Sequence, residues 1–149
     1  MMDMTLHSTI SGFIFAAVVL LAGCTTTAQK EVELHKVVIQ VSSDDAATQA
    51  LAMNNAVNLQ QAIGMDNVSI EIVAYGPGLS MLLDGTTNSR RVSSLAKQDI
   101  VFSACGNTMK KVEAKQGRPV ILSEGVGVVP AGVQRIMELQ EQGFSYVRP

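Results

Sequence analysis

Short apolar runs rich in β-branched residues alternate with longer segments of helical periodicity, and this alternation most constrains the fold. The runs are largely apolar rather than alternately apolar and polar, which is typical of strands covered on both faces. They predict strands at 36–41, 67–75, 99–104, 119–122 and 144–147. Strands that alternate with helices indicate a parallel sheet, so we expect a three-layer α/β/α fold with a mainly parallel five-stranded sheet.

Helix start and stop signals lie between these runs. The short polar residues 42–45 suit an N-cap, and Gly64 ends the helical pattern of residues 46–63. Gly76-Pro77-Gly78 breaks the second strand sharply. Shorter helices are expected near 79–83, at 90–97, after Cys105 as far as Gly117, and at 130–142, with a loop at 85–89. The last helix has Pro130 in its first turn and Gly143 just past its end, the usual asymmetry.

The N-terminus carries a different signal. Residues 10–22 form an apolar run too short for a bilayer core, which needs about 20 helical residues, so they resemble a signal peptide. Leu21-Ala22-Gly23-Cys24 resembles a bacterial lipobox, in which the cysteine is acylated, although residues 1–11 contain no Lys or Arg. The alternative is an ordinary signal peptide or a buried helix with an incidental cysteine.

The lipobox resemblance divides the chain into three parts. They are a signal peptide at 1–23, lipidated Cys24 with a polar tether at 24–35, and one α/β domain at 36–149. The mature protein is expected in the cell envelope, anchored to the membrane by lipid and facing the periplasm. Thr25 stands where a retention aspartate would favour the inner membrane, so the outer membrane is the expected location.

Composition excludes several classes of function. Charged residues are 16% of the chain, the formal net charge is -2 and Trp is absent, so nucleic acid is not expected as a partner. Both histidines, His7 and His35, precede the predicted domain, which excludes a Cys-His pair, a Ser-His-Asp triad and a His-rich metal site within it. CxxC, GxGxxG and Walker A motifs are also absent. We therefore expect no metal and no cofactor.

Cys105 is the main candidate for chemistry. In open α/β sheets, ligands bind at the carboxyl ends of the strands, which places four segments on one rim: 42–45, 75–78, 104–108 and 123–127. A thiol between a strand end and a helix start faces unpaired backbone N–H groups, which favour the thiolate. Free cysteines are also often buried and inert, so this alternative stays open.

The other residues of the rim are candidates for ligand binding. Asn107 and Thr108 can hydrogen-bond an anion or the thiolate, or can simply cap the helix. Tyr75 can direct its hydroxyl to the rim or pack at the strand end. Asp44 can act as an acid or base or can cap the helix that follows the first strand, and Gly76 and Gly78 allow the backbone to turn tightly.

Five stretches resemble a known family when they are taken together. They are KVVIQVSSDD (36–45), ALAMNNAVNLQ (50–60), IEIVAYGPGL (70–79), CGNTM (105–109) and VPAGVQRIMELQEQGFSYVRP (129–149). As a set they resemble the DsrE/F-like superfamily, in particular its single-cysteine branch. The resemblance implies a five-stranded three-layer fold, a homo-oligomer, and sulfur relay through a cysteine persulfide, with Cys105 at the position of the branch's own cysteine.

Two functional hypotheses follow. In the first, a membrane-anchored DsrE-like domain uses Cys105 to hold sulfur or to exchange thiols with a donor or acceptor protein. In the second, an envelope lipoprotein binds a small ligand or a protein at the same rim without catalysis, and its cysteine is buried. A purely structural envelope role is a third possibility.

Overall fold

The structure is a computed structural model that describes residues 34–149; the predicted signal peptide and Cys24 lie outside the described residues. The described residues belong to one compact unit. Its five strands are all parallel, in the order β4-β3-β2-β1-β5. They are β1 (His35–Val41), β2 (Val68–Ala74), β3 (Ile100–Cys105), β4 (Val126–Val129) and β5 (Ser145–Val147). The predicted fold class is confirmed.

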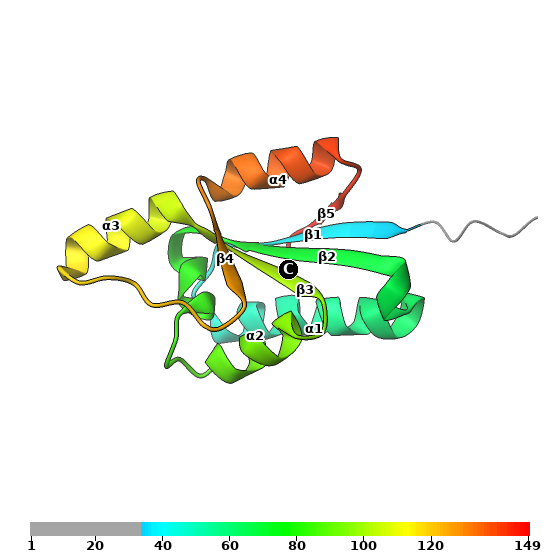
Figure 1. Cartoon of the computed structure of the whole chain (residues 1–149), viewed down its shortest axis with the longest axis horizontal. Helices are drawn as coiled ribbons and strands as arrows, with labels where there is room; N and C mark the ends of the chain where they lie inside the picture. Colours follow the sequence, from blue (N-terminus) through cyan, green and yellow to red (C-terminus); the bar gives the residue numbers. More distant parts are fainter. Residues whose placement is uncertain (1–33) are drawn as a thin grey trace, which may run out of the picture. The chain divides into compact units, whose positions relative to one another are not determined.

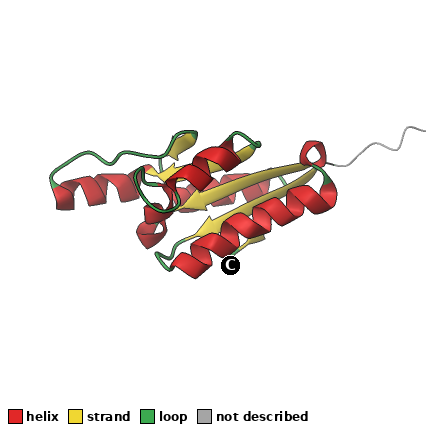
Figure 2. Ribbon diagram, turned by 90° about the horizontal axis from the view of Figure 1, so that it is seen from below, coloured by secondary structure: helices red, strands yellow, loops and turns green. Residues whose placement is uncertain are grey.

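Helices lie on both faces of the sheet (Figure 1). On one face are α1 (Ala46–Ile63) and α2 (Ser89–Ala96), and on the other is α4 (Gly132–Glu141). Two 3₁₀ segments flank β2 in the sequence: η1 (Met65–Asn67) precedes it and η2 (Gly76–Leu82) follows it. The remaining helix, α3 (Gly106–Gln116), covers neither face. It continues outward past the carboxyl ends of the strands, as Figures 1 and 2 both show.

Alternate residues of each strand supply two unequal cores. The larger core joins the sheet to α1 and α2, and Ile39, Met53 and Phe102 are fully buried within it. The smaller core lies under α4 and consists of Val38, Val73, Ile136 and Leu139. Among residues 34–149, α4 is the only helix on its face, and Val101 of β3 is 50% exposed there. Within residues 34–149, no helix has the length and apolar character needed to cross a membrane.

The start of α1 matches its sequence signal. Asp45 is the N-cap, and its carboxylate accepts hydrogen bonds from the Thr48 backbone N–H at 2.7 Å and the Thr48 hydroxyl at 2.8 Å. The backbone hydrogen bond from Thr48 is the main cause that lowers the pKa of Asp45, with the Thr48 side chain next. Gly64 follows the helix with φ +98, a conformation that suits glycine.

We expect Asp45→Ala to lower the urea midpoint of unfolding near neutral pH, because α1 loses its N-cap. The sign of the pH dependence follows from the lowered pKa: the stabilisation is present above the unfolded-state pKa of about 3.9 and is lost as the pH falls through the folded-state pKa. The midpoints of the variant and the wild type should therefore converge in acid. Asp44→Ala is the matched control, since Asp44 is exposed and is not the cap. An equal effect of both substitutions would contradict the capping role.

The predicted fourth strand, 119–122, is wrong. In this segment only Leu122 forms a bridge, an isolated antiparallel one to Leu83, and β4 lies at Val126–Val129 instead. Gly125, with φ +85, turns the chain into β4, which pairs with β3 from Phe102 to Cys105. An edge strand tolerates glycine, so Gly127 does not prevent pairing.

The last helix also begins later than predicted. Ala131 is the N-cap of α4, so Pro130 precedes the helix instead of occupying its first turn. The prediction for its end is confirmed, because α4 stops at Glu141 and Gly143 follows with φ +88. The shift matters for the site, since it places the first residues of α4 directly after the carboxyl end of β4.

Candidate functional site

Cys105 lies where β3 passes into α3. It is the last residue of β3 and the N-cap of α3, and 5% of its surface is exposed. The strand register pairs Cys105 with Val129, the last residue of β4. The cysteine is therefore buried just inside the rim formed by the carboxyl ends of the strands.

Two opposing effects act on the Cys105 thiol. Burial on its own raises the pKa of the thiol, whereas hydrogen bonds stabilise the thiolate and outweigh burial, so the pKa lies below its ordinary value. The largest of these hydrogen bonds comes from the Thr108 side chain. Backbone N–H groups supply the others, in the order Gly132, Thr108 and Asn107. The Asn107 N–H also donates to the Pro130 carbonyl at 3.2 Å, so its contribution is shared.

The Thr108 hydroxyl is oriented by a second contact. Its oxygen accepts a hydrogen bond from the Gly76 backbone N–H at 3.0 Å. A threonine hydroxyl has one proton to donate, and an acceptor contact with Gly76 leaves that proton available for Cys105. The segment after β2 thus fixes the group that stabilises the thiolate at the end of β3.

Two helix N-termini converge on the thiol. Asn107 and Thr108 belong to the first turn of α3, and Gly132 is the first residue of α4. Both helices exceed eight residues, and the N–H groups of their first turns, which have no partner within the helix, favour an anion. The arrangement can hold a negative charge on sulfur.

Gly132 can approach the thiol only because it lacks a side chain. A Cβ at this position would lie 3.0 Å from the Tyr75 Cβ and 3.1 Å from the Tyr75 Cδ1. Tyr75 itself is half-buried and packs against the smaller core. Of the two roles considered for Tyr75, the structure supports packing, and the ring forms the wall against which α4 begins.

The remaining predicted candidates lie less close to the chemistry. Gly78 lets η2 pack on β1, because a Cβ there would lie 2.3 Å from the Val41 carbonyl oxygen. Asp44 is exposed, and none of the hydrogen bonds that shift the Cys105 pKa involves it. The side chain of Asn107 is exposed, and only its backbone faces the site. Thr108 and Gly76 are thus the candidates that the structure brings together with Cys105.

One of the four predicted rim segments is wrong. Residues 123–127 were expected at a strand end because the fourth strand was expected at 119–122. Since β4 lies at Val126–Val129, the segment that completes the rim is 130–132. Gly132 was therefore missed. Its signal was a glycine directly before a helical pattern, but the misplaced strand hid its relation to Cys105.

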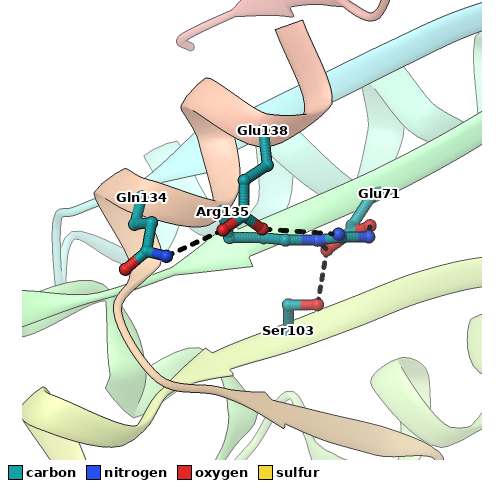
Figure 3. Close-up of polar contacts among 5 residues, drawn as sticks. All are labelled: Glu71, Ser103, Gln134, Arg135 and Glu138. Carbon is teal, nitrogen blue, oxygen red and sulfur yellow. Dashed lines mark hydrogen bonds and ion pairs between the residues drawn. The ribbon is translucent and has the colours of Figure 1, made fainter. Parts of the chain in front are cut away.

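A buried polar network was missed as well (Figure 3). Glu71 of β2 is 4% exposed and accepts a hydrogen bond from the Ser103 hydroxyl at 2.6 Å. Arg135 of α4 makes a bidentate pair with the same carboxylate, at 2.9 Å from Nε and 2.7 Å from a terminal nitrogen. Hydrogen bonding to Glu71 raises the pKa of Arg135, against the opposing effect of burial.

This network connects to the cysteine through the backbone. Ser103 lies two residues before Cys105 on the same face of β3, and Arg135 lies about one helical turn after Gly132. The pairing of Arg135 with Glu71 therefore fastens the first turn of α4 to the middle of the sheet. This contact keeps the Gly132 N–H near the thiol.

Metal chemistry has no support in the described part of the chain. Among residues 34–149, no three His, Cys, Asp or Glu residues lie close enough together to hold a metal ion. Cys105 is the free cysteine of this region. Its thiol is the nucleophilic group of the arrangement.

Thr108→Val should raise the pKa of Cys105, because the substitution keeps the volume of the side chain but removes the hydroxyl. Thiolate absorbance in the ultraviolet, followed through a pH titration, measures this shift. Thr108→Ser retains the hydroxyl and should restore the wild-type titration. An unchanged curve for Thr108→Val would show that the backbone N–H groups alone stabilise the thiolate.

The fold and the site define a class: an all-parallel α/β protein with one cysteine at the sheet rim between two helix N-termini. Residues 35–149 match the DsrE/DsrF-like family. The chain belongs to the DsrE/DsrF-like family.

Two solved structures have a similar fold. The first is MTH1491 from Methanobacterium thermoautotrophicum, described as a protein of unknown function, with 35% identity and a TM-score of 0.69 over 77% of this chain and 99% of that one. The second is the ychN protein from E. coli, with 14% identity and a TM-score of 0.60 over 78% of this chain and 100% of that one. At this identity, the second shows the fold alone. The comparison with curated proteins gave no match.

Proposed function

We propose that Cys105 is a reactive thiol that carries one sulfur atom as a persulfide between a donor and an acceptor. The observation that carries the proposal is the position of Cys105 between the end of β3 and the start of α3, where the Thr108 hydroxyl and nearby backbone N–H groups lower the pKa of the thiol despite its burial. Thiolate is the nucleophilic form of cysteine, so a lowered pKa increases the reactive fraction near neutral pH. The DsrE/DsrF-like family, which is linked to sulfur relay, adds support to this assignment.

The loading step needs no oxidant. The Cys105 thiolate attacks the outer sulfur of a donor persulfide, R–S–SH, and forms a new S–S bond. The original S–S bond of the donor breaks, and R–S⁻ leaves with the electron pair. The products are Cys105–S–SH and a donor thiolate, so charge, protons and electrons balance. In the unloading step, an acceptor thiolate attacks the outer sulfur of Cys105–S–SH and forms a new S–S bond. The S–S bond to Cys105 breaks, and the Cys105 thiolate is restored.

The geometry of the thiol favours a carrier of this kind. Only 5% of Cys105 is exposed, so a donor must present its outer sulfur atom at the rim, where a bulky disulfide has little access. An added sulfur lies about 2 Å beyond Sγ and extends the reactive atom toward the rim. The N–H groups of α3 and α4 can then stabilise the anionic persulfide as they stabilise the thiolate.

The cellular context is part of the same proposal. We propose that the chain is a lipoprotein of the single-cysteine branch, acylated at Cys24 after removal of a signal peptide, and that it works as a homo-oligomer facing the periplasm. The support is the short apolar run at 10–22, whose last two residues begin the motif Leu21-Ala22-Gly23-Cys24. Two acyl chains give stable anchoring, since each buried methylene contributes about 0.8 kcal/mol.

One observation favours a second candidate function. Cys105 is buried, and buried free cysteines are often inert. The second candidate is therefore a non-catalytic envelope lipoprotein that binds a small ligand or a protein at the rim. In that case Thr108 and the N-termini of α3 and α4 would serve the ligand and not the thiol.

Sulfur loading distinguishes the two candidates. A chain that begins at Gln29 contains the whole compact unit and a single thiol, and it would be incubated with inorganic polysulfide. We expect the intact mass to rise by one sulfur atom and cyanide, which removes sulfane sulfur, to reverse the increase. A folded protein that gains no sulfur while its unfolded form does would reject the carrier and leave the binding protein.

A further inference from the structure

The helix that begins at Cys105 forms a projecting arm. We define the basic arm as residues 106–118, which comprise α3 and the two residues after it. The arm extends past the carboxyl ends of the strands (Figures 1 and 2), and no residue of α3 is fully buried. Only Met109 and Val112 pack against the core. The arm thus presents most of its surface to its surroundings.

The arm is strongly basic in a chain of net charge -2. Its exposed cations are Lys110, Lys111, Lys115 and Arg118. Its single carboxylate belongs to Glu113, which accepts a hydrogen bond from the Val120 backbone N–H at 3.0 Å. Within residues 34–149, none of the four cations forms an ion pair. The positive charge of the arm is therefore left for a partner.

The charge lies beside the candidate site. Lys110 and Lys111 follow the cysteine by five and six residues, about 8–9 Å along a helix axis. Val128 is 57% exposed and borders the start of the same helix, since a Cβ at Gly106 would lie 3.5 Å from the Val128 Cγ1. Protein-binding surfaces usually combine apolar side chains with a polar, solvent-accessible rim, and Val128 with the lysines of the adjoining helix has this composition.

We infer that the basic arm docks a carboxylate-rich surface of the protein that delivers sulfur to Cys105 or removes it. The inference rests on the proposed function, because it assigns a partner to the same thiol. Complementary charge raises the rate of encounter and fixes orientation more than it adds affinity. The arm therefore brings the partner's thiol to the rim in a defined orientation.

The position of the arm favours a protein over a membrane surface. In a parallel sheet all strands begin at one end of the sheet and finish at the opposite end. The chain enters β1 at His35, at the end where the strands begin, whereas α3 starts at the end where they finish. A lipid anchor on the N-terminal side of β1 would therefore join the described residues at the end of the sheet opposite the arm. A symmetric contact between two copies of the arm would oppose lysine to lysine and is disfavoured by repulsion.

Docking can be measured separately from sulfur chemistry. The protein would carry Cys105→Ser, and the probe would be a fluorescein-labelled peptide of glutamate residues with a central serine. We expect K110E/K111E to weaken binding by roughly tenfold and added salt to weaken it further. R90E/R148E is the matched control, because it makes the same change in net charge at exposed residues outside the arm. Its binding should be unchanged.

Transfer then connects docking to the thiol. With Cys105 intact and loaded, sulfur should pass faster to a glutamate-flanked cysteine peptide than to a glutamine-flanked one, and K110E/K111E should remove this preference. Loading from inorganic polysulfide should not change, since that donor needs no docking.

Equal peptide binding by K110E/K111E and R90E/R148E would overturn the inference. So would arm-dependent binding to phosphatidylglycerol vesicles without binding to the peptide. A loss of loading alone would instead reject the proposed function.

Discussion

Arg135→Leu is expected to lower the free energy of unfolding by about 3 kcal/mol, the lower end of the range for removal of one partner from a buried ion pair. The substitution leaves the Glu71 carboxylate, whose side chain is 5% exposed, with only the Ser103 hydroxyl as partner. The Arg135 side chain is 30% exposed, so water offsets part of its loss. Urea unfolding at neutral pH, monitored by circular dichroism, measures the change.

The double variant E71M/R135L tests the cause of that effect. Removing both charges also removes the cost of an unpaired buried carboxylate, so the double variant should be more stable than Arg135→Leu alone. Glu138→Ala is a control, because its contact with Arg135 is longer, at 3.8 Å, and more exposed. Equal stability of the double variant and Arg135→Leu would contradict the explanation based on an unpaired charge.

Cys105→Ser should abolish sulfur loading completely while leaving the fold intact. Serine is close in size to cysteine and its oxygen can accept the same hydrogen bonds, but a hydroxyl forms no persulfide. Intact mass after treatment with polysulfide measures loading, and thermal unfolding measures the fold. The expected result is a folded protein with no added sulfur.

A comparison with Thr108→Val strengthens this prediction. That variant keeps the thiol, so it should still load, but more slowly at neutral pH because less thiolate is present. Sulfur that stays bound to Cys105→Ser through denaturation would contradict the assignment, since the described part of the chain holds no other free cysteine.

The sequence predicts those parts of the fold whose signals are local. α1 begins and ends where expected, at Ala46 and Ile63, because a capping aspartate and a glycine flank it. Cys105 and Thr108 could be predicted as neighbours because both lie within one turn of a strand end. Short-range patterns of this kind depend little on the rest of the molecule.

The misplaced fourth strand shows where local signals fail. Residues 119–122 contain three large apolar side chains, as many as the observed strand, yet Ile121 is 64% exposed. The observed β4 contains Gly127 and is stabilised by its pairing with β3, which no local pattern reports. Composition thus does not distinguish the two segments, and the pairing with β3 determines which of them is a strand.

Long-range contacts explain what the sequence did not predict about the site. Gly132 reaches Cys105 only through the packing of α4, and Arg135 contacts Glu71 across 64 residues of sequence. A single carboxylate inside a largely apolar strand was the available hint for Glu71. The partner of Glu71 could not be predicted, because the sequence contains several Lys and Arg residues and does not show which of them packs against β2.

The most direct test of the central claim is the alkylation rate of Cys105 from about pH 5 to 9, in the folded protein and in denaturant. A pKa lowered by hydrogen bonds predicts that the folded protein reacts, with a midpoint clearly below the value of about 8.5 for a free thiol. The denatured protein should titrate near that free value. A thiol that reacts only in denaturant would contradict the account and identify Cys105 as a buried structural residue.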